Sequence, residues 1–160
     1  MCGIVGFTSN GHDPAAAKRT AQAMADLIRH RGPDGEGYYA DTRAALAVIG
    51  ADFYGNPADQ LHIIGITGTK GITSTALLTS ASMTEAGLPC AYIGSNGVDI
   101  AGVHENTANT TPESLELHRL FRKMLDANVH HVVLEVSSQA LRHNRVDGIP
   151  FEVVAFTNLS

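Results

Sequence analysis

The sequence predicts an α/β fold: a mostly parallel sheet with flanking helices, preceded by a short N-terminal strand-helix appendage. Two observations support this fold class. Short apolar runs rich in β-branched residues alternate with longer segments of helical periodicity, an order that favours parallel strands joined by right-handed crossovers. A glycine-rich turn also joins one of these apolar runs, residues 62–67, to a helical segment.

The N-terminal part of the chain has its own pattern. Gly3–Ser9 is apolar with small residues and predicts a strand, and the alanine-rich segment Pro14–Arg31 predicts a helix. The cluster at residues 31–37 predicts a turn. Helical spacing returns from Thr42 to about Phe53, and Asn56-Pro57 then breaks it.

From residue 62 onward, strands and helices alternate. His62–Thr67 is nearly all apolar, as is typical of a parallel strand buried on both faces. We expect Thr111 to cap a helix over Pro112–Ala127, because threonine is a good N-cap. The other predictions are a helix over Thr73–Ala86, a hairpin or extended loop over Gly97–Val103, and strands over Cys90–Gly94, His131–Val136 and Val153–Thr157.

Composition excludes several classes of protein. With 44% hydrophobic and 17% charged residues the chain is globular, and a net charge of −5 without a basic run argues against nucleic-acid or acidic-membrane binding. Two cysteines form no disulfide framework, and no apolar run has the length of a membrane span, so we expect a cytoplasmic protein. The adjacent His130 and His131 are not spaced like metal ligands and are read as a pair at a strand edge.

The glycine-rich turn after residue 67 has the layout of a phosphate-binding loop. Such loops need small residues that let backbone N–H groups converge on phosphate oxygens, a helix N-terminus and a hydroxyl for Mg²⁺. Gly68, Gly71, Thr73 and Ser74 supply these features. The general pattern places lysine after the second glycine, whereas this chain has Ile72 there.

Several ordered motifs resemble the Mur ligases, and most closely their tripeptide-forming (MurE) type. The resemblance covers about residues 41–160. The segments that carry it are Asp41–Ala47, Phe53–Pro57, Ile64–Thr69, Asn109–Glu113, Glu135–Leu141, Arg145-Val146 and Phe156–Ser160.

This resemblance implies an ATP- and Mg²⁺-dependent ligase of peptidoglycan synthesis. In that family ATP phosphorylates the carboxylate of a UDP-N-acetylmuramoyl peptide, and the amine of an amino acid then attacks the acyl phosphate. By the resemblance, ATP phosphates would lie on Gly68, Thr69, Lys70, Gly71, Thr73 and Ser74; Mg²⁺ on Thr73 and Glu135; and the UDP-linked substrate on Asn109, Thr110, Thr111, Ser137 and Arg145.

Each of these roles has a simpler structural alternative. Thr111 would serve only as an N-cap, Ser137 and Ser138 only as a strand-to-helix turn, and Glu135 only as a carboxylate facing water at a strand end. These alternatives stay open at the level of sequence.

The chain departs from the family at position 72 and at its C-terminal end. The family has a catalytic lysine where Ile72 stands, and such an ammonium stabilises the transferring phosphoryl group. Because the family accepts lysine at position 70 beside the catalytic one, Lys70 is not expected to replace it. The family's carbamylated lysine and its amino-acid-binding C-terminal domain lie beyond Ser160. We therefore expect ligase activity to be impaired while weak nucleotide binding survives.

The N-terminus resembles a different family, the class II glutamine amidotransferases of the asparagine synthetase type. Met1–Phe7 and Arg29–Gly37 carry this likeness. It implies that Cys2 becomes an N-terminal nucleophile that attacks a glutamine amide. Nothing later in the chain matches the family's oxyanion hole, without which such a nucleophile is a poor catalyst.

The chain is therefore predicted to be composite, with an amidotransferase-like segment over residues 1–40 and an incomplete ligase ATP-binding domain over 41–160. Two alternatives to an impaired ligase stay open. One is a non-catalytic module that binds a nucleotide or a UDP-sugar, and the other is an amidotransferase fragment. The sequence does not predict the oligomeric state or the amino acid that would be added.

Overall fold

The computed structural model describes Ala23 and residues 42–159. The chain divides into two compact units, Met1–Ala45 and Leu46–Ser160, and the described sheet belongs to the second unit. Apart from Ala23, which is helical, the predicted strand at Gly3–Ser9, helix at Pro14–Arg31 and turn at 31–37 lie outside the described residues.

The described part is a mixed α/β fold around a six-stranded sheet with the strand order β4-β3-β2-β5-β1-β6. The fold class predicted from the sequence is confirmed. The elements are α2 (Thr42–Phe53), η2 (Pro57–Gln60), β1 (His62–Thr67), α3 (Ile72–Glu85), β2 (Cys90–Gly94), β3 (Gly97–Ile100), β4 (Val103–Glu105), α4 (Ser114–Asp126), β5 (His131–Glu135), α5 (Ser138–Arg142) and β6 (Phe151–Phe156).

The parallel strands β2, β5, β1 and β6 form the part of the sheet that positions the site. β1 lies between β5 and β6, which explains why its apolar run alternates so little with polar residues. The register pairs Ile66 with Glu135 and Thr67 with Phe156, so these neighbouring strands end at the same level. The β3–β4 hairpin adds antiparallel strands beside β2, as the sequence allowed for residues 97–103.

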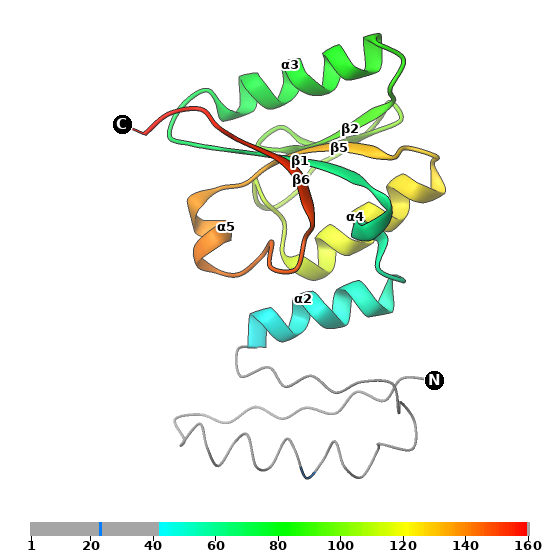
Figure 1. Ribbon diagram of the computed structural model, residues 1–160, viewed down its shortest axis with the longest axis vertical. Coiled ribbons are helices and arrows are strands. Elements are labelled where there is room, and N and C mark those ends of the chain that lie inside the picture. The colour runs from blue at the N-terminus through cyan, green and yellow to red at the C-terminus, as the bar shows by residue number, and fades with distance from the viewer. Residues whose placement is uncertain (1–22, 24–41, 160) are drawn as a thin grey trace. The chain divides into compact units, whose positions relative to one another are not determined.

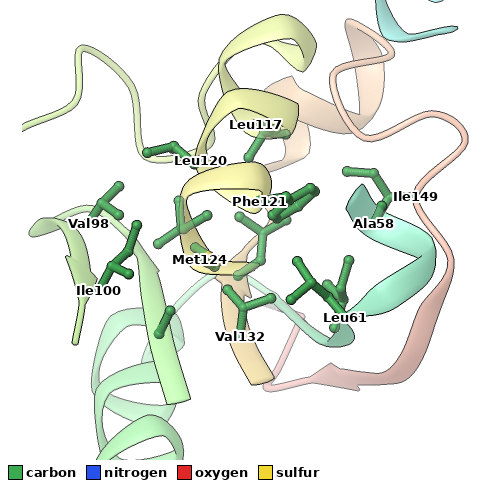
Figure 2. Close-up of a cluster of buried hydrophobic side chains, with 14 of the residues drawn as sticks. Ala58, Leu61, Val98, Ile100, Leu117, Leu120, Phe121, Met124, Val132 and Ile149 are labelled. Atoms are coloured by element: carbon green, nitrogen blue, oxygen red, sulfur yellow. The ribbon is translucent and has the colours of Figure 1, made fainter. Parts of the chain in front are cut away.

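Helices cover both faces of the sheet, with α3 on one side and α4 on the other (Figure 1). Under α3, Ile66, Ala76, Tyr92 and Val133 form a small buried cluster. The larger cluster lies under α4, where Leu117, Leu120, Phe121 and Met124 pack on the sheet and on η2 (Figure 2). The predicted apolar face of the 112–127 helix is therefore confirmed, because it is removed from water against the sheet.

Some boundaries differ from the sequence prediction. The predicted cap at Thr111 is wrong, because α4 begins at Ser114 and its N-cap position is occupied by Glu113, whose side chain makes no capping bond. Pro112 favours an extended residue before it, which delays the helix. β6 begins at Phe151 and includes the exposed Glu152, which an edge strand tolerates because one side of it is solvated.

Among residues 42–159, no helix combines the length and the apolar character needed to cross a membrane.

Candidate active site

A cavity of about 290 Å³ lies where the parallel strands end. It is bounded by the glycine-rich loop and first turn of α3, by the residue after β2, by the segment before α4 and by the end of β5. The lining residues are Thr69, Lys70, Gly71, Ile72, Thr73, Ser74, Ser95, Thr110, Glu135 and Ser137. Open α/β sheets bind ligands at this edge, so the location agrees with the general rule for such folds.

The loop between β1 and α3 has the backbone that its glycines permit. Gly71 occupies the N-cap position of α3 with φ of 78°, a conformation that glycine adopts without strain. Among the described residues, no side chain caps the start of α3, so the first N–H groups of this helix have no side-chain acceptor there. Such N–H groups, together with the positive end of the helix dipole, attract an anion.

Glu135 is a buried carboxylate at the end of β5, with only 2% of its surface exposed. Its Oε2 accepts hydrogen bonds from the hydroxyls of Thr73 at 3.0 Å and Ser95 at 3.1 Å, and its Oε1 accepts one from the Ser95 N–H at 3.2 Å. The alternative that Glu135 is a carboxylate facing water is wrong. A buried carboxylate needs such donors, and here they come from two segments of the chain, the first turn of α3 and the residue after β2.

A second buried side chain, Tyr92 of β2, also contacts the Glu135 carboxylate. Its hydroxyl donates to Oε1 of Glu135 at 2.5 Å. Burial raises the pKa of Tyr92, and the hydrogen bond to Glu135 raises it further, so the phenol stays protonated and remains a donor at neutral pH. Gly94 leaves the space for this pair, because a Cβ there would collide with both the carboxylate and the phenol oxygen.

The predicted substrate residues before α4 separate into different environments. Thr110 lines the cavity, and its hydroxyl is 3.1 Å from that of Ser95. Thr111 is fully buried and donates to the Glu135 backbone carbonyl at 2.8 Å, so it fixes the strand end rather than facing the cavity. Asn109 is exposed and is not among the described residues that line the cavity.

Ser137 caps a short helix and also lies on the cavity, so its predicted contact with the substrate stays a prediction. Its side chain caps α5 by accepting from the Ala140 N–H at 3.1 Å, and it also lines the cavity. Its own N–H donates to the Thr111 hydroxyl at 3.0 Å, which ties the two segments together. Capping therefore fixes this serine beside the cavity, where a ligand can reach it.

Arg145, the last predicted substrate residue, is engaged within the chain. Its Nη1 donates to the Thr111 carbonyl at 3.1 Å, and its Nη2 pairs with Glu113 Oε1 at 2.7 Å. The side chain is 12% exposed, and its buried Nε has no hydrogen-bond partner within residues 42–159. The arginine thus braces the segment that carries Thr110, and it does not line the cavity as described.

Ile72 occupies the start of α3 and faces two environments. It lines the cavity, and it also packs against the small cluster under α3 that contains Ile66 and Tyr92. An apolar side chain has no donor to offer a phosphate, but it covers part of the core there. Among the described lining residues, Lys70 is the one with a positive charge.

Sequence reasoning missed three residues of this site: Tyr92, Ser95 and Asn158. Ser95 directly follows a predicted strand, so the rule that ligands gather at strand ends was sufficient to find it. Asn158 follows β6 and hydrogen-bonds to the loop at Thr69 and Lys70. Tyr92 lies within an apolar strand, and nothing in the pattern distinguishes it from a core residue.

The residues chosen as Mg²⁺ ligands meet the chemical requirements of that ion. Mg²⁺ prefers oxygen ligands and is usually held by one or two protein groups together with water and phosphate oxygens. Thr73 and Glu135 present a hydroxyl and a carboxylate that are in direct contact at the cavity. Within residues 42–159 there is no cluster of three or more His, Cys, Asp or Glu side chains suited to a metal, so a dedicated protein cage is not built there.

The fold and the loop agree with a comparison of the sequence to known families. The family model described as "Mur ligase middle domain" matches residues 66–160, more than half of the chain. The chain belongs to the Mur ligase family. The match begins within β1 and includes the loop, Glu135 and Asn158.

Two curated relatives of this Mur ligase chain share one name. The UDP-N-acetylmuramoyl-L-alanyl-D-glutamate--2,6-diaminopimelate ligase of Geobacter metallireducens is 40% identical over 159 residues, covering 97% of this chain and 31% of that protein. The ligase of the same name from Clostridium perfringens is 47% identical over 120 residues, covering 75% of this chain and 25% of that protein. The chain therefore spans about a third or less of the length of these relatives.

A solved structure supports the fold. "Structure of UDP-N-acetylmuramoyl-L-alanyl-D-glutamate--2, 6-diaminopimelate ligase" superposes with a TM-score of 0.64 at 23% identity, covering 88% of this chain and 31% of that chain. At this identity the likeness concerns the fold alone.

A second family model, described as "Glutamine amidotransferase domain", matches residues 1–50. This agrees with the resemblance seen at the N-terminus. Cys2 lies outside the described residues, and the domain boundary near residue 40 stays a prediction.

Proposed function

We propose that this chain carries the ATP-binding part of a peptidoglycan ligase, in the cytoplasm, and that it binds Mg-ATP but is impaired in phosphoryl transfer. The complete reaction adds an amino acid to a UDP-N-acetylmuramoyl peptide through an acyl phosphate. Membership of the Mur ligase family and the names of the relatives support this reaction class. The added amino acid suggested by those names is 2,6-diaminopimelate.

One observation carries the nucleotide site. The Thr73 hydroxyl, in the first turn of α3, meets the buried Glu135 carboxylate at 3.0 Å on the wall of the cavity. Loop glycines, an uncapped helix start and paired oxygen ligands are the parts that a phosphate-and-magnesium site requires. A structural turn alone does not need a carboxylate to be buried beside an uncapped helix.

The predicted site residues then have the following roles. The N–H groups of Gly71, Thr73 and Ser74 bind phosphate oxygens, while Thr73 and Glu135 hold Mg²⁺. When bound, that ion neutralises charge on the phosphates. Thr110 and Ser137 offer hydroxyls to the acceptor substrate from their part of the cavity wall. We place Asn109, Thr111 and Arg145 in support of that wall, because none of them lines the cavity as described.

Ile72 limits what the site can do. Losing one charge-assisted contact weakens binding by roughly 1.5–3 kcal/mol. The effect on transfer is larger, since fixed charges at a phosphoryl group act mainly in the transition state. Ground-state binding of the nucleotide therefore survives better than catalysis.

A thermal melt with and without Mg-ATP tests the proposal, because a ligand that binds only the folded state raises the melting temperature. We expect an increase with Mg-ATP, a smaller one with ATP and EDTA, and none with AMP, which lacks the β- and γ-phosphates. The same melting temperature in all conditions contradicts the proposal. Stabilisation without any ATP hydrolysis favours the alternative of a non-catalytic nucleotide- or UDP-sugar-binding module.

The match at residues 1–50 supports a second candidate function, glutamine hydrolysis with Cys2 as nucleophile. Ammonia release from glutamine that disappears in Cys2→Ala would support it. Glutamine hydrolysis that is absent, or unchanged by Cys2→Ala, rejects it.

A further inference from the structure

The end of β6 is tied to the phosphate loop by two consecutive residues, Thr157 and Asn158. The Thr69 hydroxyl donates to Asn158 Oδ1 at 2.7 Å, and the Thr69 N–H donates to the Asn158 carbonyl at 3.1 Å. One residue earlier, the Thr157 N–H donates to the Thr67 carbonyl at 2.9 Å, which continues the strand pairing into the loop. The loop is therefore anchored to the sheet by a neighbour that is distant in sequence.

The main chain of Lys70 is held on both sides by the same asparagine. Asn158 Oδ1 accepts from the Lys70 N–H at 3.1 Å, and Asn158 Nδ2 donates to the Lys70 carbonyl at 3.2 Å. The Thr157 hydroxyl donates to that carbonyl as well, at 2.9 Å. Because one partner is a donor and the other an acceptor, only one orientation of the amide satisfies both.

We refer to Thr157 and Asn158 together as the clamp. The clamp holds a loop segment that would have many conformations without it. Lys70 lies between Gly68 and Gly71, which have φ values of 146° and 78°. Glycine visits such angles readily but also many others, so an unanchored loop loses entropy when it orders around a ligand. A Cβ on Gly68 would collide with the Thr157 hydroxyl and meet the Asn158 main chain at 3.1 Å, so the clamp also explains this glycine.

The charge of Lys70 indicates the function of the clamp. Of the described residues that line the cavity, Lys70 alone is positive, and the position where the general pattern has lysine is occupied by Ile72. We infer that Lys70 is the phosphate-binding cation of this cavity and that Asn158 is the positioning residue that holds it there. This inference rests on the proposed function and deepens it. It concerns binding of the phosphates and gives Lys70 no part in their transfer.

The first experiment measures the affinity of Mg-ATP and of inorganic tripolyphosphate by titration calorimetry. Lys70→Met removes the charge and keeps the length of the side chain. We expect it to weaken both ligands about tenfold or more, as for the loss of a charge-assisted contact. Lys70→Arg should restore most of the affinity. Lys123→Met is the matched control, because Lys123 pairs with Glu105 and does not line the cavity, and it should leave the affinity unchanged.

The second experiment separates positioning from general stability. Asn158→Ala frees the Lys70 backbone, so it should weaken both ligands and also reduce the salt dependence of binding that reports the ammonium contact. In the double variant with Lys70→Met, the loss should be clearly smaller than the sum of the two single losses, because Asn158 acts in part through Lys70. Additive losses, or a salt dependence that Asn158→Ala does not change, overturn the positioning role.

The remaining outcomes are also decisive. If the unchanged chain binds Mg-ATP but Lys70→Met binds it equally well, the inference fails and the proposed function stands. If the unchanged chain binds neither ligand, both fail. Intact folding of each variant is checked by its circular dichroism spectrum and melting curve in the absence of ligand.

Discussion

The Tyr92 hydroxyl donates a hydrogen bond of 2.5 Å to Oε1 of Glu135, and each of these side chains is only 2% exposed. The pair joins β2 to the end of β5, because Tyr92 lies in register with Val133 and Glu135 follows two residues later. It holds one oxygen of the carboxylate, while Thr73 contacts the other. The tyrosine thus fixes the rotamer of a proposed metal ligand from within the core.

Tyr92→Phe should destabilise the fold by about 1–3 kcal/mol, because a buried carboxylate loses a hydrogen-bond donor. Urea denaturation measures the change. Tyr54→Phe is the control, since Tyr54 is only partly buried and packs edge-on against Phe53; it should change stability by less than about 0.5 kcal/mol. Equal effects of the two substitutions would show that the Tyr92 hydroxyl contributes nothing.

Ile72→Lys should improve nucleotide binding at some cost in stability. The new ammonium adds a charge-assisted contact, worth about 1.5–3 kcal/mol, to the phosphates. Removing the apolar side chain from the cluster near Ile66 and Tyr92 should lower the free energy of unfolding by about 1 kcal/mol without ligand. Calorimetry with Mg-ATP and urea denaturation measure the two effects. The control is Ile72→Met, which is apolar and uncharged and should show neither a gain in affinity for Mg-ATP nor hydrolysis of ATP. If Ile72→Lys binds Mg-ATP no better than the parent, the proposed site is refuted.

Thr73→Val tests the magnesium site. The substitution keeps the shape of the side chain and removes the hydroxyl that contacts Glu135. We expect the affinity for Mg-ATP to fall about tenfold, while the affinity for ATP in EDTA changes little, since only the former uses the hydroxyl. Thr73→Ser retains the hydroxyl and should behave like the parent. Equal losses with and without Mg²⁺ would indicate a packing effect instead.

His118 predicts a loss of stability in mild acid. It is 2% exposed on α4, packs against Phe121, and its Nδ1 has no hydrogen-bond partner in the described structure. Burial lowers its pKa, although Asp59 opposes this shift. Below the ordinary histidine pKa of about 6.5 the unfolded chain takes up a proton that the folded chain resists, so the free energy of unfolding falls as pH falls.

Urea denaturation between about pH 7 and pH 5 measures this dependence, a range that brackets the ordinary histidine pKa. His118→Leu should flatten it, because the group that charges on unfolding is gone. His130→Gln, a change at an exposed histidine, should leave it unaltered. A slope that is the same in all three chains would assign the acid sensitivity to other groups.

Arg145→Lys should not be a conservative change. The guanidinium bridges the Thr111 carbonyl and Glu113 with separate nitrogens, which a single ammonium cannot reproduce. We expect a loss of about 1–3 kcal/mol in unfolding free energy for Arg145→Lys. Arg142→Lys, on the exposed part of α5, should change it by less than about 0.5 kcal/mol. If both changes cost the same, Arg145 does not brace the segment as described.

Local patterns in the sequence determined the parallel core. The apolar run His62–Thr67, the glycine-rich turn and the apolar stripe of α4 each encode one element by its period or by its turn residues, and all three lie where they were predicted. The glycine-rich loop was also indicated by sequence, because a phosphate site needs particular residue types in a fixed local order, whereas Glu135 was indicated only by the resemblance to the Mur ligases.

Only the tertiary structure decided which of these residues meet. Thr111 satisfied the rules for an N-cap, but it is used instead to bond the end of β5 across 24 residues of sequence. Tyr92 contacts Glu135 across 43 residues of sequence and Asn158 contacts Lys70 across 88, and no local period in the sequence encodes either contact. A sequence pattern reports the preferences of neighbouring residues, whereas hydrogen bonds between strand ends depend on sheet order and register, and these are set by packing of the whole core.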